Sequence, residues 1–142
     1  MQAYHPSSDQ SLAQRINAAS PEQLVALLLE GAQRFLAQGR QAMGRKDFAA
    51  KARSINRTLA IVEELVLRLD QEQGGELAAN LARVYDWWSR EILAASATKD
   101  EGRLDRINRQ MGEMRQVWEQ LDQQQRGSMP APAAFQLQSM VV

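Results

Sequence analysis

Cysteine is absent from the 142-residue chain, and histidine occurs once, as His5. The lack of cysteine excludes a disulfide framework, a thiol nucleophile and a zinc site built on sulfur, and it suits a reducing compartment. A single imidazole near the N-terminus supplies neither a histidine-based triad nor the Glu-x-x-His pairs of a di-iron bundle. Phosphate-binding loops of the GxGxxG or GK(S/T) type are also missing. We therefore expect no catalytic residue, no cofactor and no metal, and a protein that is not an enzyme.

Long apolar runs and an excess of one charge are missing as well. No run approaches the roughly 20 apolar residues that span a bilayer, and the first residues lack the basic and apolar regions of a signal peptide. We expect a cytoplasmic protein without membrane insertion. The 17 Lys and Arg residues balance 17 Asp and Glu residues, which argues against a protein whose main task is binding nucleic acid.

Proline and strand-forming residues are scarce. The four prolines all lie outside residues 22–129, so no proline interrupts a helix in this range. Val, Ile and Thr together supply 14 residues, whereas Ala, Leu and Gln supply 54. This composition favours helices over strands and predicts an all-α protein.

Start and stop signals divide the chain into four long helices. Ser20 precedes Pro21 and Gln23 in a capping box, Asp47 and Asp100 are further N-caps, and Gly74-Gly75 interrupts the pattern between them. Helices over 21–44, 48–69, 76–98 and 101–126 with short turns predict an antiparallel up-and-down four-helix bundle. Three regions follow from this reading: an arm or short helix over 1–20, the bundle over 21–126, and a low-complexity tail over 127–142.

Apolar spacing identifies the faces that form the core. The last helix alternates steps of three and four residues, which is a heptad seam. Its members are Leu104, Ile107, Met111, Met114, Trp118 and Leu121.

The first long helix has more apolar residues than one core stripe requires. Leu24, Leu28 and Phe35 form one stripe, and a second lies beside it. Trp87 and Trp88 are about 100° apart around the third helix, so that both cannot face the same layer. The surplus predicts either a groove for a partner helix or a wide bundle covered by the arm or tail. The second stripe consists of Val25, Leu29, Ala32, Leu36 and Met43.

A basic segment lies between residues 33 and 57, where seven Lys and Arg residues accompany one acidic residue, Asp47. Such an excess could attract an acidic partner or RNA. We favour a solvated flank and end of the bundle over a binding surface, because the segment contains no aromatic residues beyond Phe35 and Phe48, which fit the core. An RNA-binding bundle remains one alternative interpretation.

Several short motifs, in this order and spacing, resemble the family of flagellar export chaperones for flagellin, known as FliS. One segment departs from the family pattern, because Leu28-Leu29-Glu30-Gly31 stands where the family often has Leu-Tyr-Asp-Gly. The motifs are Tyr4 in the arm, Ala19 to Val25, Gly31-Ala32, Asp47-Phe48, Leu69-Asp70, Gly74-Gly75, Ala78-x-Asn80-Leu81, Tyr85-Asp86 and Arg115-x-x-Trp118.

The resemblance implies a cytoplasmic chaperone without ATPase activity. Such a chaperone binds the disordered C-terminal segment of flagellin, prevents premature polymerisation and presents flagellin to a component of the flagellar type III export gate. The competing interpretation is a helical adaptor that forms a homodimer through its second stripe and has no dedicated client.

Partner-binding residues are predicted on two grounds. The resemblance suggests that Tyr4 lies near the groove and regulates entry to it. Helical position and surplus hydrophobicity select the other candidates, which are Val25, Leu29, Leu36, Tyr85 and Trp87.

Overall fold

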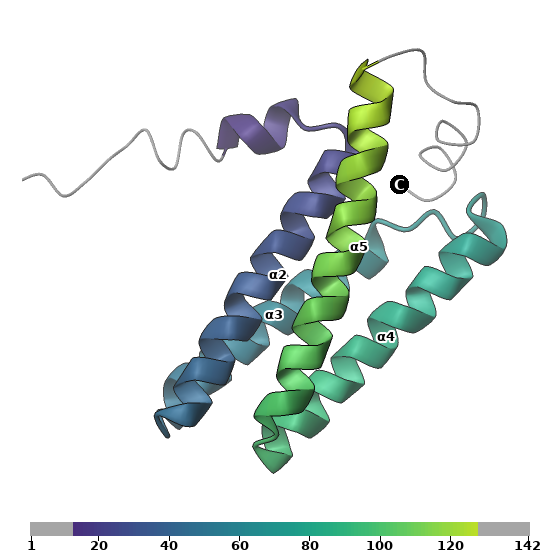
Figure 1. Ribbon diagram of the computed structural model, residues 1–142. Helices are drawn as coiled ribbons and strands as arrows, with labels where there is room; N and C mark the ends of the chain where they lie inside the picture. The colour runs from purple at the N-terminus through teal and green to yellow at the C-terminus, as the bar shows by residue number, and fades with distance from the viewer. Residues whose placement is uncertain (1–12, 128–142) are drawn as a thin grey trace, which may run out of the picture.

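The computed structural model describes residues 13–127, which are helical apart from short turns. A short helix over residues 13–18 precedes the long ones (Figure 1). The long helices are α2 (Pro21–Gly44), α3 (Phe48–Leu67), α4 (Gly75–Thr98) and α5 (Glu101–Gly127).

The predicted caps begin three of the long helices. Ser20 Oγ accepts a hydrogen bond from Gln23 N (3.0 Å), Asp47 Oδ1 accepts one from Ala50 N (3.2 Å), and Asp100 Oδ1 accepts one from Arg103 N (3.1 Å). Each side chain satisfies a backbone N–H that has no partner within its helix. The capping box is only half formed, since the Gln23 side chain accepts a hydrogen bond from Arg126 instead.

Helix α2 has the predicted bounds, whereas α3 ends at Leu67, two residues earlier than predicted, and the chain turns over residues 68–74 before α4. The C-cap of α2 is Arg45, and the left-handed residue of the turn that follows is Lys46, with φ 62°. Lys99 adopts the same conformation after α4, with φ 57°. For a residue with a Cβ this conformation costs about 1 kcal/mol relative to glycine.

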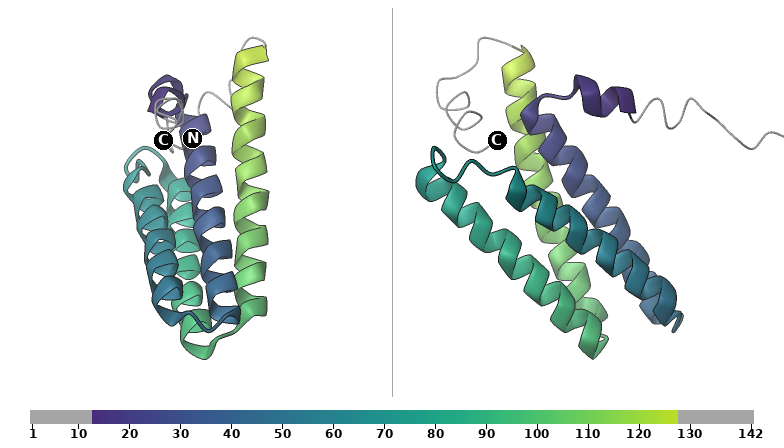
Figure 2. Two further views of the ribbon diagram at one scale, coloured as in Figure 1. Left: turned by 90° about the vertical axis from the view of Figure 1, so that its left-hand side faces the viewer. Right: turned by 180° about the vertical axis from the view of Figure 1, so that it is seen from behind.

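The four long helices form the expected antiparallel up-and-down bundle. Helix α2 packs against α3 and α5, and α4 closes the ring between the same two helices. Contacts of α4 with its neighbours are fewer than those of α2. Figures 1 and 2 show α4 leaning away from α5 toward the end of the bundle that holds the α3–α4 turn.

The core lies along the bundle axis and contains the seam predicted for α5. Leu104, Ile107 and Met111 are at most 2% exposed, Trp118 is 4% exposed, and Met114 and Leu121 pack against them while partly buried. Among the described residues, no helix is long and apolar enough to cross a membrane.

The second apolar stripe of α2 is not surplus, and that prediction was wrong. Val25, Leu29 and Leu36 are at most 3% exposed and form the centre of the core, whereas Leu24, Leu28 and Phe35 are half-buried at its edges. The physical reason is that α2 contacts two helices, α3 and α5, and therefore buries a wide face instead of one narrow stripe.

Candidate functional site

An apolar groove lies between α4 and α5. It has a volume of about 570 Å³ and is lined by Asn80, Arg83, Val84 and Trp87 from α4 and Gln110 from α5. We call this surface the α4–α5 groove. The α4 residues share one flank because they are spaced by three, four and seven positions, which returns a helix to nearly the same side. The surface of the groove is mainly apolar, and it contains the exposed ring of Trp87.

The two adjacent tryptophans take the different positions that their 100° separation predicts. Trp88 is 1% exposed, and its ring centroid lies 5.6 Å from that of Tyr85 in the core. Trp87 is 46% exposed and forms part of the α4–α5 groove. A half-exposed tryptophan beside apolar neighbours is a typical anchor for a partner, because it buries a large area with little loss of conformational freedom.

Polar contacts connect α4 to its neighbours mainly along its C-terminal half. Lys51 Nζ donates to the carbonyl of Ser96 (3.2 Å), and Arg103 of α5 forms an ion pair with Glu91 (2.7 Å). Farther up the helix, Trp88 Nε1 donates to Gln110 Oε1 (3.0 Å) across the floor of the groove.

The N-terminal part of α4 lacks such connections. Within the part of the chain that the structure describes, the side chains of residues 75–84 form no hydrogen bond or ion pair with another helix. Apolar packing alone therefore attaches this end of α4, and apolar packing tolerates sliding better than directional bonds do. Asn80, Arg83 and Val84, which line the groove, belong to this N-terminal part of α4.

The structure separates the predicted partner-binding residues into three groups. Trp87 lines the α4–α5 groove, as described above. Val25, Leu29, Leu36 and Tyr85 are at most 3% exposed in the core, so that the premise that placed them on a free surface was wrong. Burial also raises the pKa of the Tyr85 hydroxyl above its ordinary value. Tyr4 lies outside the described residues.

Sequence reasoning missed most of the groove lining. The spacing of Asn80, Val84 and Trp87 on α4 could have shown that they share a flank. No pattern in the sequence indicated that Gln110 of α5 would close the groove, because its position depends on how the two helices cross.

A cluster of polar side chains lies where the start of α2 meets the end of α5. Glu22 is 1% exposed, and Ser20 Oγ donates to Asp122 Oδ1 (2.6 Å), which also accepts from Arg126 Nε (3.2 Å). Burial raises the pKa of the Glu22 carboxyl above its ordinary value of 4.5, and the charge of Asp122 adds to the rise. Its own backbone N–H and the side chains of Ser20 and Gln125 oppose the shift without cancelling it.

Metal ligands do not gather in the described part of the chain. Residues 13–127 contain no group of three or more His, Cys, Asp or Glu side chains that could hold an ion.

Comparison with known proteins identifies the family of the chain. Residues 3–125 match a family model described as flagellar protein FliS. The chain is 32% identical to flagellar secretion chaperone FliSB of Pseudomonas aeruginosa over 119 residues, which cover 84% of this chain and 94% of that protein. It is 30% identical to flagellar secretion chaperone FliS of Salmonella typhimurium, covering 78% of this chain and 83% of the relative. The relative from Vibrio cholerae, also a flagellar secretion chaperone FliS, is 32% identical, with 85% and 87% covered.

Proposed function

The chain belongs to the FliS family of flagellar secretion chaperones, and from that premise we propose that it binds the C-terminal segment of flagellin in the α4–α5 groove. The family consists of chaperones, so the protein is not an enzyme. The observation that carries the proposal is the half-exposed Trp87 in an apolar groove. A non-enzymatic protein with such a surface is suited to bind an apolar segment of another chain.

The energetics favour a client that folds on binding. A disordered amphipathic segment loses chain entropy when it becomes a helix, and burial of apolar surface at about 25 cal/mol per Å² offsets that loss. Trp87 and Val84 supply apolar area on the chaperone side. In this proposal the flagellin segment stays disordered until it binds, and binding keeps it from assembling with other flagellin molecules.

Helix α4 is suited to adapt to the client. Because residues 75–84 are attached to the bundle by apolar packing alone among the described residues, a small outward movement of this end widens the groove without breaking a polar bond. In this proposal Val25, Leu29 and Leu36 of α2 act indirectly, by forming the core against which α4 packs, and Tyr85 anchors α4 in that core. Tyr4 is proposed to lie near the groove and to regulate entry.

Binding in the groove would prevent flagellin from polymerising, because the bound segment is no longer available to other flagellin molecules. An apolar face of flagellin that is buried in the groove cannot also pack against other flagellin molecules. We further propose that the complex forms in the cytoplasm and is delivered to a component of the flagellar type III export gate, where the client is released.

The proposal is tested with paired substitutions on α4 and a fluorescently labelled peptide covering the last forty or so residues of the matching flagellin. Trp87→Ala should weaken binding by about 30-fold, the typical effect of removing a tryptophan anchor worth about 2 kcal/mol. The control is Leu93→Ala, because Leu93 is 55% exposed on the same helix and does not line the groove. Equal affinities for Trp87→Ala and wild type would exclude the groove as the binding site. If the wild-type protein binds no peptide and sediments as a dimer, the homodimeric adaptor interpretation replaces this one.

A further inference from the structure

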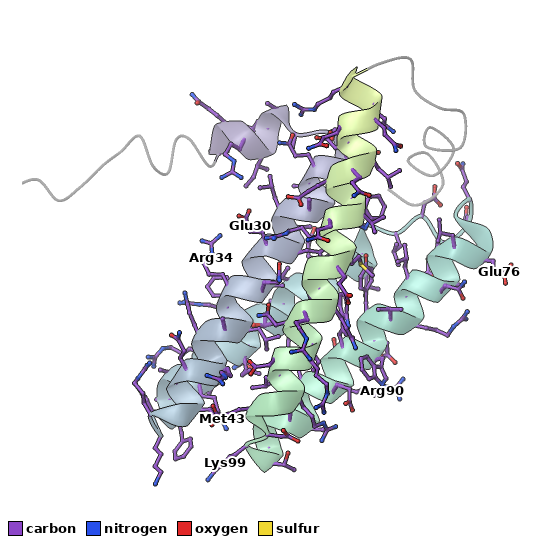
Figure 3. All side chains as sticks on the ribbon, in the orientation of Figure 1. Glu30, Arg34, Met43, Glu76, Arg90 and Lys99 are labelled. Carbon is purple, nitrogen blue, oxygen red and sulfur yellow. The ribbon has the colours of Figure 1, made fainter. Side chains whose placement is uncertain are left out.

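One end of the bundle carries an exposed aromatic ring of its own. The α2–α3 turn and the α4–α5 turn lie together at this end, where Figure 3 labels Met43 and Lys99. Phe48, the first residue of α3, is 42% exposed there. It was predicted to fit the core, but its ring is partly open to solvent at the end of the molecule.

Four cationic side chains accompany this ring. The Nζ atoms of Lys51 and Lys99 lie 5.4 and 4.7 Å from the Phe48 ring centroid, at distances where the ring face attracts a cation. Arg45 and Lys46 are exposed in the turn immediately before it. Among residues 13–127, none of the four has a carboxylate within 4 Å. We call these five residues the basic end.

Neighbouring acidic residues neutralise the basic end only in part. The Asp47 carboxylate accepts the N–H of Ala50 and the Asp100 carboxylate accepts the N–H of Arg103, so both cap helices, keep their charge and form no ion pair with the four cations. Glu101 lies 3.5 Å from Arg40 and forms an ion pair with it. Four cations beside the two capping carboxylates leave an excess of positive charge that no ion pair within the described residues uses.

Two helices end at the basic end with a left-handed residue that is lysine, although glycine is the usual residue at this position. Lys46 and Lys99 are the two non-glycine residues of positive φ in the described part of the chain, and each follows a helix at this same end. Glycine is the residue that adopts this conformation without strain. Strained backbone of this kind is concentrated at functional sites, where the side chain is needed.

We propose that the basic end is a docking surface for an acidic segment of a second protein, with an apolar side chain of that segment seated on Phe48. The charge complementarity identifies the partner class, and the partly exposed ring adds an apolar contact at its centre. Twelve residues separate Lys99 from Trp87, which is roughly 18 Å along a helix. The α4–α5 groove and the basic end can therefore be occupied at the same time, so this inference does not depend on the client proposed above.

A nucleic acid is a less suitable occupant. Sequence-tolerant binding of a single strand uses a groove of cations that follows the backbone, together with aromatic rings on which successive bases stack. The basic end presents four cations around one ring. An oligonucleotide nevertheless provides a discriminating probe.

The test uses the full chain and a blocked nine-residue peptide of glutamates with leucine at its centre. Amide chemical shifts measured at low salt should change over residues 45–51 and 98–100 on addition of the peptide and return when salt is added. The double variant Lys46→Gly and Lys99→Gly should weaken binding about fivefold, as expected for two exposed charge pairs. The same variant should melt at least about 3 °C higher, because glycine relieves the strain. A loss of affinity in this variant therefore does not result from unfolding.

The control removes the same number of charges elsewhere. Arg34→Gln with Arg53→Gln changes two exposed cations outside the basic end and should leave peptide affinity within twofold of wild type. The proposal is overturned if the control weakens binding as much as the glycine variant does, or if shifts are absent or spread over other surfaces. Tighter binding of a nine-nucleotide thymidine strand than of the peptide would identify nucleic acid as the occupant instead.

Discussion

Trp87 and Trp88 show that helical geometry determines the exposure of single residues. The two side chains are chemically identical and adjacent in the chain, yet one is 46% exposed in a groove and the other is 1% exposed in the core. The 100° rotation between neighbours accounts for the difference. Gln110 links the two environments, since its Oε1 accepts the Trp88 N–H while its side chain lines the groove.

Replacement of Gln110 should destabilise the fold. Gln110→Ala leaves the indole N–H of Trp88 without its acceptor in a site that is 1% exposed, and an unsatisfied buried donor costs about 1–2 kcal/mol. Thermal or urea unfolding measures the effect. Gln116→Ala is the control, because Gln116 is exposed on the same helix. Equal stability of the two variants would show that the hydrogen bond contributes nothing.

Glu22 should make stability depend on pH. Its pKa is raised in the folded state, chiefly by burial, so the native protein binds more protons than the unfolded chain between the unfolded and folded pKa values. This contribution to stability is complete below pH 4.5 and is lost as pH rises through the folded pKa. Glu22→Gln should therefore stabilise the protein at pH 7, and its advantage should disappear as pH falls below about 4.5.

Urea unfolding between pH 4 and 8 measures this effect, with Glu119→Gln as the control because Glu119 is exposed on α5. A pH-independent difference between Glu22→Gln and wild type would refute the assignment. Sequence reasoning could not identify this residue as buried. Glu22 follows the capping serine as an acidic residue of the first turn, and its burial depends on where the end of α5 crosses α2.

At the scale of elements, the helices and their up-and-down order were predictable, whereas the width of the face that each helix buries was not. Ser20, Asp47 and Asp100 begin the helices that they were expected to begin, because caps and periodicity are local. The role of the Val25 and Leu29 stripe depends on how many helices surround α2, which is a property of the assembled bundle. Periodicity alone therefore located the apolar residues correctly and assigned their partners wrongly.

The α2–α3 contact is close enough to require glycine at one position. A Cβ on Gly39 would lie 3.1 Å from Ile55 Cδ1 and 3.4 Å from Ser54 Cβ. Gly39→Ala should destabilise the protein by about 1 kcal/mol, because crowding against α3 exceeds the gain in helix propensity. Gly102→Ala, whose Cβ would lie 3.6 Å from the nearest atom, should instead be neutral or stabilising by about 0.5 kcal/mol. Chemical denaturation distinguishes them, and a stabilised Gly39→Ala would contradict the close approach.

For the molecule as a whole, the net charge is zero, but charged and apolar surfaces are distributed unevenly over it. The α4–α5 groove opens beside the loosely attached end of α4, while unpaired cations gather at the opposite end of that helix. A single core to which all four long helices contribute connects the two surfaces. The family resemblance could be recognised from the sequence, whereas the location of both surfaces required the packing of the helices.

Calorimetry of the wild-type protein with the flagellin C-terminal peptide, at several temperatures, tests the chaperone assignment most directly. The account predicts one-to-one binding with a negative heat-capacity change, together with a gain in helical circular dichroism on mixing, because a disordered segment folds as it buries apolar surface. Absence of binding, or binding without a heat-capacity change, would contradict the assignment of the α4–α5 groove to flagellin.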